Sequence, residues 1–384
     1  MNTDNSAAPD WALLRTDTRL GELDRQLGEF LAELDGDSPW LKVAAALASR
    51  AAARGEIYFD LSEIPAFVEP WPGVGQWREQ LLSSSVVGEA GSHRALVLDA
   101  RDRLYLHRFW VYQQDLARDL RARAALRPRR FNGARLQRTL DRLDASVTGF
   151  GAMSPLILAT AALCRICVVQ ASASIWAELL SSLLVVVGGQ LGRRLNVLVA
   201  GPGAQRNALE SLLARAAKDP NLLAEERLQW PAEPITLEHL PRDRRRSHQG
   251  SYGEEPPMRV DLVMVVGAEA ADLVMLANLV RVLPPYTRLV LLGDVRGAPR
   301  PEHSPFAALL AGPGQSDTFR RRLGWLLGEN LALGSEPVNA LQNAVVTPLL
   351  ISPAVADGGL YQAFWEDTGG DREVAEHNPE EDQS

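Results

Sequence analysis

The hydrophobic pattern is clearest between Asp261 and Asp294. Two short apolar runs, Asp261–Val266 and Arg288–Leu292, flank a stretch in which leucine and valine recur at helical spacing. Pro284-Pro285 ends that stretch. The pattern predicts strand, helix and strand, and such a unit places two parallel strands in a sheet that is covered on both faces.

The same alternation begins earlier, near residue 165. Ile166–Val169 and Leu195–Ala200 are predicted strands, and each precedes a predicted helix, Ile175–Val187 and Ala204–Ala217. Three strand–helix pairs in succession indicate one doubly wound α/β domain with a parallel sheet, of the RecA-like or Rossmann-like kind.

The longest apolar stretch is Ile175–Val187, which contains Glu178 and ends at Gly188-Gly189. Because it is about half as long as a bilayer-spanning helix, we interpret it as a buried core helix and expect no membrane association.

The N-terminal residues follow a mixed pattern. Helices are predicted over Asp17–Leu34 and Leu41–Ala53, and a β-hairpin pairs Arg94–Asp99 with Arg103–His107. Arg108–Arg123 continues from the hairpin as a helix. These elements predict a small α+β domain.

Domain limits follow from these patterns. A charged stretch with a proline, residues 125–130, separates a domain over residues 1–125 from the parallel-sheet domain over residues 126–335. Residues 336–384 form a third segment with a strand-like run at Ala344–Leu350, and its acidic end is expected to be disordered.

Charge argues against a strongly basic nucleic-acid-binding protein, because 40 Lys and Arg stand against 48 Asp and Glu, a net charge of −8. The local basic run Arg242–Arg246 favours a solvated loop, with a nucleic-acid contact as the alternative.

Cys164 and Cys167 form a C-x-x-C pair, but they are the only cysteines, and a zinc site needs two further ligands. We interpret them as buried structural thiols. The six histidines are scattered and form no metal-binding motif. With no secretory signal in the sequence, a reducing cytoplasm is expected.

Nucleotide chemistry would be expected after the first and third strands of the parallel sheet. A phosphate-binding loop needs glycines, a lysine and a Ser or Thr hydroxyl, whereas Gln170–Glu178 has neither glycine nor lysine, and its Trp176 and Glu178 would crowd and repel phosphate. The third strand ends in Gly267-Ala268 where carboxylates usually hold Mg²⁺. Glu269 could be a displaced metal ligand, and Asp272 fits a helix N-terminus better.

An aromatic and basic cluster follows the hairpin, and it consists of Tyr105, Arg108, Phe109, Trp110 and Tyr112. Three interpretations are open: anchoring of the helix to the hairpin, a protein partner, or stacking on nucleic-acid bases. The negative net charge disfavours the third, and we predict these residues as a partner-binding surface.

Several segments resemble the RecD family, the alpha subunit of exodeoxyribonuclease V. Leu104–Ala117, with the sequence LYLHRFWVYQQDLA, and Leu81–Gly88 resemble the end of its N-terminal domain. Four further segments resemble its motor domains in order: Leu195–Gly203, Thr236–Leu240, Asp261–Asp294 and, faintly, Ala344–Ser352. The resemblance covers roughly residues 10–350 and implies a RecD-like N-terminal domain, then one RecA-like (P-loop NTPase-type) domain.

The departures from this family are consistent with one another. The Gly, Lys and Thr of its phosphate-binding loop fall on Ser174, Ala177 and Glu178, and its Asp-Glu pair falls on Gly267 and Ala268. Its later glutamine and arginine motifs are missing, and the chain stops before most of a second motor domain. ATP and Mg²⁺ are therefore not expected as cofactors, and no catalytic residue is assigned.

The first hypothesis is a non-catalytic, cytoplasmic RecD-like subunit that associates with RecB- and RecC-like proteins, in the family through RecC, and meets DNA through that complex during double-strand break repair and recombination. The second is a divergent ATP-dependent helicase subunit that uses Glu269, Asp294 and Arg296. The third is an independent DNA-binding module that uses Arg242–Arg246 and the aromatic cluster.

Overall fold

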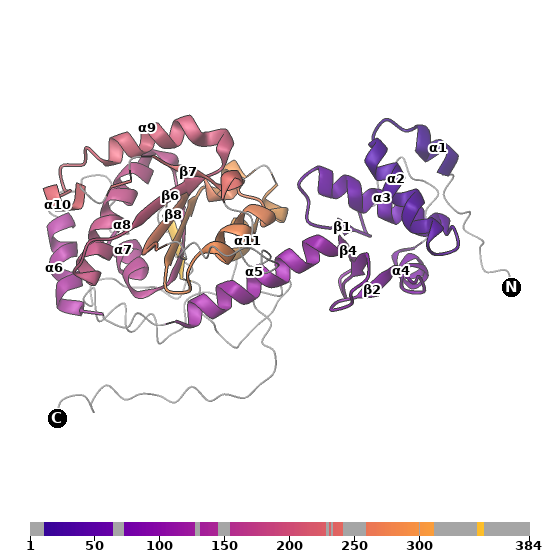
Figure 1. The fold of residues 1–384 in the computed structure, drawn as a ribbon, viewed down its shortest axis with the longest axis horizontal. Coiled ribbons are helices and arrows are strands. Elements are labelled where there is room, and N and C mark those ends of the chain that lie inside the picture. The colour runs from indigo at the N-terminus through magenta and orange to yellow at the C-terminus, as the bar shows by residue number, and fades with distance from the viewer. Residues whose placement is uncertain are drawn as a thin grey trace, which may run out of the picture.

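The computed structural model describes residues 11–63, 73–126, 131–144, 154–227, 230–231, 233–240, 259–298, 300–310 and 344–348. Its strands form two sheets, one of four strands and one of six. Figure 1 shows the two sheets in separate lobes, with helix α5 (His107–Ala125) running from one to the other.

The N-terminal lobe combines short helices with the four-stranded sheet. Its elements are α1 (Trp11–Thr16), α2 (Glu22–Glu33), α3 (Pro39–Ala53), β1 (Phe59–Asp60), α4 (Val74–Leu82), β2 (Val87–Glu89), β3 (Leu96–Leu98) and β4 (Arg103–Leu106). The strand order is β1-β4-β3-β2. The predicted hairpin is confirmed, since β3 and β4 pair antiparallel with Leu96 opposite Leu106. Trp77, which has no exposed surface, lies in the core of this lobe.

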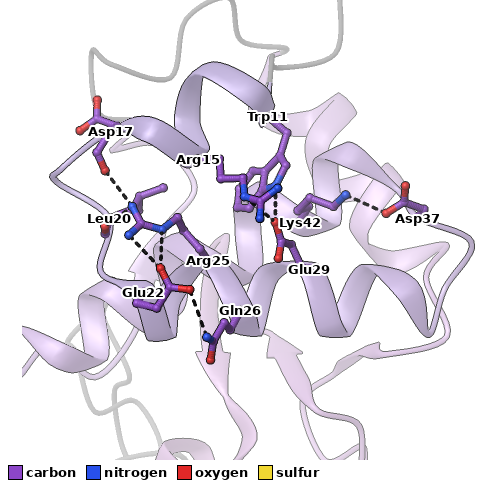
Figure 2. A network of polar contacts seen from close by, with 10 residues as sticks. All are labelled: Trp11, Arg15, Asp17, Leu20, Glu22, Arg25, Gln26, Glu29, Asp37 and Lys42. Atoms are coloured by element: carbon purple, nitrogen blue, oxygen red, sulfur yellow. Dashed lines mark hydrogen bonds and ion pairs between the residues drawn. The ribbon is translucent and has the colours of Figure 1, made fainter.

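Helix α2 begins later than the predicted helix over Asp17–Leu34. Asp17 accepts a hydrogen bond from the Arg19 backbone N–H at 2.8 Å, and the Gly21 N–H donates to Asp24 Oδ2 at 2.9 Å. These local side-chain bonds form a turn that competes with the helix, so α2 begins at Glu22. Figure 2 shows Asp17 and Leu20 beside the start of α2, where Arg25 donates to the backbone carbonyl oxygens of both and pairs with Glu22.

The second lobe is an α/β domain. Its elements after α6 (Gly133–Asp144) and α7 (Ser154–Leu163) are β5 (Ile166–Ala171), α8 (Trp176–Leu191), β6 (Val197–Gly201), α9 (Arg206–Ala216), α10 (Ala224–Arg227), β7 (Ile235–Thr236), β8 (Leu262–Val266), α11 (Leu273–Val282), β9 (Arg288–Gly293), α12 (Pro305–Leu310) and β10 (Ala344–Pro348). The predicted strand–helix–strand unit is therefore β8-α11-β9, and its strands pair in parallel.

The sheet order is β10-β5-β9-β8-β6-β7, and the strands from β5 to β7 are parallel. The first strand, β5, therefore neighbours β9 and not the second strand, β6. In the Rossmann and flavodoxin-like orders the first two strands are neighbours, so this topology speaks against the Rossmann-like alternative.

Both faces of the sheet are covered. Met264 and Val266 of β8 belong to a core that includes residues of α6, α7, α8 and α9, whereas Val263 and Val265 belong to a core with α5, α11 and α12. Successive side chains of a strand point to opposite faces, so a strand buried on both reads as a continuous apolar run. That burial explains the uninterrupted hydrophobicity of the predicted strands.

The apolar helix packs against the sheet as predicted, but it is longer than the predicted Ile175–Val187, so the length argument was wrong. Ala173–Leu191 is long and apolar enough to cross a membrane, with a mean hydropathy of 1.5, and no other described helix passes that test. In the structure α8 packs between α6, α7, α9 and the sheet, with Leu180 and Val187 fully buried.

Two packing contacts cross the predicted domain limits, which stay predictions. The inner face of α5, with Leu116 and Leu120, packs on α11 within the core of the α/β domain, although the predicted boundary follows α5. Helix α5 ends at Ala125, and its inner face already packs on α11 several turns before that point. Strand β10 lies in the third predicted segment, residues 336–384, yet it pairs antiparallel with β5 and extends the sheet of the preceding domain.

Candidate functional site

The carboxyl ends of the parallel strands form the candidate site, because open α/β sheets bind ligands at that edge. The turn after β5 is short: Ser172 and one 3₁₀ turn, Ala173–Ile175, lead directly into α8. The Trp176 indole N–H donates to the Ala171 carbonyl oxygen at 2.9 Å and so covers the end of the strand. Ser174 and Glu178 are exposed, and Ala177 is buried.

At the end of β8, the backbone of Gly267 lies close to the side chain of Gln205. Gly267 has φ +70°, a left-handed conformation that glycine adopts without strain. A Cβ at this position would lie 2.1 Å from Oε1 of Gln205, which follows β6. Ala268 is fully buried, and Asp272 accepts from the Met275 N–H at 2.7 Å as the N-cap of α11, the role that its sequence position predicts.

Three side chains meet between the ends of β5, β8 and β9. The amide of Gln170 donates to Asp294 Oδ1 at 2.7 Å and accepts from the Val295 N–H at 2.8 Å. Glu269 Oε2 accepts from the Asp294 N–H at 3.1 Å. We call Gln170, Glu269 and Asp294 the edge cluster. A Cβ at Gly293 would lie 2.5 Å from Glu269 Oε2, so this glycine makes room for the carboxylate.

The two carboxyl groups of the edge cluster have opposite electrostatic environments. Hydrogen bonds from the Arg296 side chain, at 2.8 and 3.0 Å, lower the pKa of Asp294 to about 2. Burial raises the pKa of Glu269, which is 7% exposed, and the nearby Asp294 charge adds to that effect. A carboxyl group that resists ionisation and another that favours it thus lie side by side.

A further carboxylate occupies the turn after β6. Both oxygens of Glu238 accept from the Gly203 N–H, each at 2.9 Å, so this turn already has an anionic partner within the chain. The strand ends of this domain are therefore filled by its own side chains. Gln170, Gln205 and Glu238 were not singled out from the sequence, since they come from distant segments that only the sheet order brings together.

The predicted partner-binding residues lie at the joint between the two lobes. Tyr105 is fully buried, with its ring 5.1 Å from Trp110. Phe109, Trp110 and Tyr112 are half-buried against the core that contains α11, and Tyr112 lies beneath the Arg281 guanidinium. Arg108 is exposed and lies over the Phe109 ring. Anchoring of α5 accounts for the four aromatic positions, and their contact with a partner stays a prediction.

Other candidate groups form no site in the described part of the chain. Cys167 is 1% exposed, and burial raises the pKa of its thiol well above the usual range, while Cys164 is partly exposed and forms no disulfide with it. Among the described residues, no three His, Cys, Asp or Glu side chains are placed to hold a metal ion. The basic run Arg242–Arg246 lies outside the described residues.

A shallow hollow of about 410 Å³ lies at the C-terminal end of α8, beside Gly188, Arg193 and Leu223. This is the edge of the sheet opposite the strand ends. Arg193 is already bound to Asp261 at 3.0 Å. The hollow therefore has no part in the candidate site.

Residues 16–105, which extend from the end of α1 into β4, match the family model of the RecBCD enzyme subunit RecD, N-terminal domain. The N-terminal domain is of the RecD type. RecBCD enzyme subunit RecD of Mycolicibacterium smegmatis (strain ATCC 700084 / mc(2)155) is 33% identical over 92 residues, which are 23% of this chain and 16% of that relative. This RecD-type domain confirms the resemblance seen in Leu81–Gly88 and at the start of Leu104–Ala117.

Proposed function

We propose that the chain is a non-catalytic RecD-like subunit that assembles with RecB- and RecC-like proteins in the cytoplasm. It would meet DNA through that complex, in double-strand break repair and homologous recombination. The observation that carries this proposal is a RecD-type N-terminal domain joined to a parallel-sheet domain whose strand ends are filled by their own side chains.

On this proposal, the second lobe is a RecA-like domain that no longer binds a nucleotide. Its parallel order, with β9 between β5 and β8, supports a doubly wound domain. The residues at its strand ends do not fit ATP with Mg²⁺: Trp176 covers the end of β5, and Gly267 and Ala268 offer no oxygen side chain. Glu269 is committed to the Asp294 N–H, and its carboxylate would repel a phosphate placed at this strand end.

Co-expression with the RecB- and RecC-like proteins of the same genome tests the assembly. A stable complex by size-exclusion chromatography is the expected result, and the absence of a complex at micromolar concentration contradicts the proposal. Titration with a fluorescent ATP analogue and Mg²⁺ tests the second part, for which we expect no saturable binding to the purified chain.

One observation favours the second hypothesis, a divergent ATPase. Glu269, Asp294 and Arg296, the residues this hypothesis needs, lie next to each other at the strand ends. Under that hypothesis the protein binds ATP, and Glu269→Ala abolishes the binding. Under our proposal neither the wild-type protein nor the Glu269→Ala variant binds ATP. The same titration therefore separates our proposal from the ATPase hypothesis.

A further inference from the structure

Cys164 lies in the turn between α7 and β5 and is the more accessible of the two thiols. Its backbone N–H donates to the Thr160 carbonyl oxygen at 2.9 Å, which fixes the residue at the end of α7. The side chain is partly exposed, whereas Cys167, three positions later in β5, is 1% exposed. A small reagent can therefore reach Cys164 without any opening of the sheet.

A buried guanidinium lies against this turn. Arg288, at the start of β9, is 3% exposed, and its Nη1 donates to the carbonyl oxygens of Ala161 at 3.1 Å and Cys164 at 2.9 Å. Burial and the nearby Arg165 charge lower the pKa of Arg288 to about 10, and a negative charge on Cys164 opposes both effects. The Arg288 cation and a Cys164 thiolate therefore stabilise each other.

Arg288 also carries a donor that its surroundings leave unused. Its buried Nε has no hydrogen-bond partner in the part of the chain that the structure describes. Buried donors without an acceptor are costly and rare in folded proteins. An oxygen atom attached to the Cys164 sulfur would bring an acceptor to this guanidinium. The surroundings of Arg288 thus favour both the thiolate of Cys164 and an oxidised form that carries oxygen.

We propose that Cys164 is a site of reversible oxidation by hydrogen peroxide, with Arg288 as the positioning residue. The Cys164 sulfur attacks one peroxide oxygen, so that an S–O bond forms as the O–O bond breaks. The sulfur gives two electrons to the peroxide, and the second oxygen leaves as hydroxide and takes up a proton to form water. The product is a sulfenic acid, which thiols reduce again. This inference does not depend on the proposed function.

The neighbouring thiol is poorly placed to consume that product. Burial raises the pKa of Cys167 well above its usual range, and the charge of Cys164 adds to the effect. Its thiolate is therefore scarce, although the thiolate is the form that condenses with a sulfenic acid. We expect the sulfenic acid of Cys164 to persist, without closure of a disulfide to Cys167.

Dimedone, which reacts with sulfenic acids but not with thiols, tests the site in the purified full-length chain. Trypsin cleaves after Arg165, so the two cysteines fall in separate peptides for mass spectrometry. On brief exposure to hydrogen peroxide, the adduct should form on Cys164 about tenfold faster in the native protein than in protein unfolded in urea, because unfolding removes the guanidinium.

Substitutions at Arg288 separate the charge from the packing. Arg288→Met should slow formation of the adduct by about tenfold, whereas Arg288→Lys, which keeps a positive charge, should retain most of the rate. Arg281→Met is the matched control, since the Arg281 side chain is 16% exposed and pairs with Asp115 of α5. It should leave the rate unchanged.

The wild-type protein alone can overturn the inference, even where an Arg288 variant does not fold. Equal rates of adduct formation in native and unfolded protein would do so. An adduct that appears on Cys167 before Cys164, or a disulfide between the two in place of the adduct, would do so as well. Dithiothreitol added before dimedone should return unmodified Cys164, and an adduct that still forms afterwards would contradict reversibility.

Discussion

Arg123 donates a hydrogen bond from Nη1 to the carbonyl oxygen of Thr287, 2.9 Å away. The same guanidinium reaches the carbonyl oxygens of Val280, in the last turn of α11, and of Leu283 and Pro284 just after it. The last carbonyl groups of a helix have no partner within the helix, and here an arginine from α5 supplies one. A buried cation thus fixes the C-terminal end of α5 to the end of α11, and burial lowers the pKa of Arg123 to about 10.

Arg123→Ala should lower the free energy of unfolding by about 3 kcal/mol, because several buried carbonyl groups lose their donor. Urea denaturation measures the change. Arg118→Ala is the control from the same helix, since Arg118 is 68% exposed and its ion pairs are superficial. That variant should stay within about 0.5 kcal/mol of wild type. An equal loss in both variants would contradict the capping role of Arg123.

Asp294 should contribute stability that disappears in acid. Its pKa in the folded protein, about 2, lies below the ordinary value of 3.8. The contribution is therefore present above the ordinary value and is lost as the pH falls toward about 2. We expect Asp294→Asn to be less stable than wild type at neutral pH, with a difference that shrinks across this window. Urea midpoints at a series of pH values measure it, and a constant difference would contradict the shift.

Glu269 should have the opposite dependence. Burial raises its pKa above the ordinary 4.5, so the folded state holds a proton that the unfolded state releases. Wild type therefore loses stability as the pH rises through the ordinary value toward the raised one. Glu269→Gln keeps an acceptor for the Asp294 N–H without the charge, so it should gain on wild type over the same rise. The pH series used for Asp294 decides this, and a relative loss on raising the pH would be the contrary result.

Gly267→Ala should be destabilising for two separable reasons. The left-handed backbone alone costs about 1 kcal/mol, and the new Cβ would also meet Gln205 Oε1. Gly55→Ala carries the first cost only, because Gly55 has φ +80° and nothing lies within 4 Å of the added atom. Thermal melting should rank Gly267→Ala below Gly55→Ala. Adding Gln205→Ala to Gly267→Ala should recover part of the lost stability. If it recovers none, contact with Gln205 does not explain the loss.

The two cysteines should differ in reactivity toward a thiol reagent. Cys167 is buried and its pKa is raised, so its thiolate is scarce and inaccessible, whereas Cys164 is partly exposed. In the native protein we expect Cys164 to react first and Cys167 to react only on unfolding. Cys164→Ser, which leaves Cys167 alone, provides the control. Rapid modification of that variant would show that the strand β5 opens readily.

Sequence patterns predicted the long buried elements well. The predicted strands Asp261–Val266 and Arg288–Leu292 each agree with β8 and β9 to within one residue at either end, because double-sided burial leaves a continuous apolar signal. The start of α2 was misplaced because the bonds of Asp17 and Gly21 compete locally with the helix. Strand β2 has only three residues, too few to show the alternation of apolar and polar positions that predicts a strand.

From the sequence, the candidate site was predicted only by comparison with the RecD family. The departures at Ser174, Ala177, Glu178, Gly267 and Ala268 are visible in the sequence, and the loss of nucleotide binding stays a prediction. The contacts that fill the edge are not visible there, because Gln170 and Asp294 meet across neighbouring strands 124 positions apart. The order β5-β9-β8 creates that meeting, and no local pattern encodes it.

The contact between Glu269 and the Asp294 N–H has a consequence for regulation. A diffusible ligand stabilises a protein only in proportion to its concentration. Glu269 is tethered to the backbone it binds, so the chain itself sets the effective concentration of the carboxylate. Under the proposed function this contact would persist while metabolite levels rise and fall, so the shape of the α/β lobe would not report the energy state of the cell.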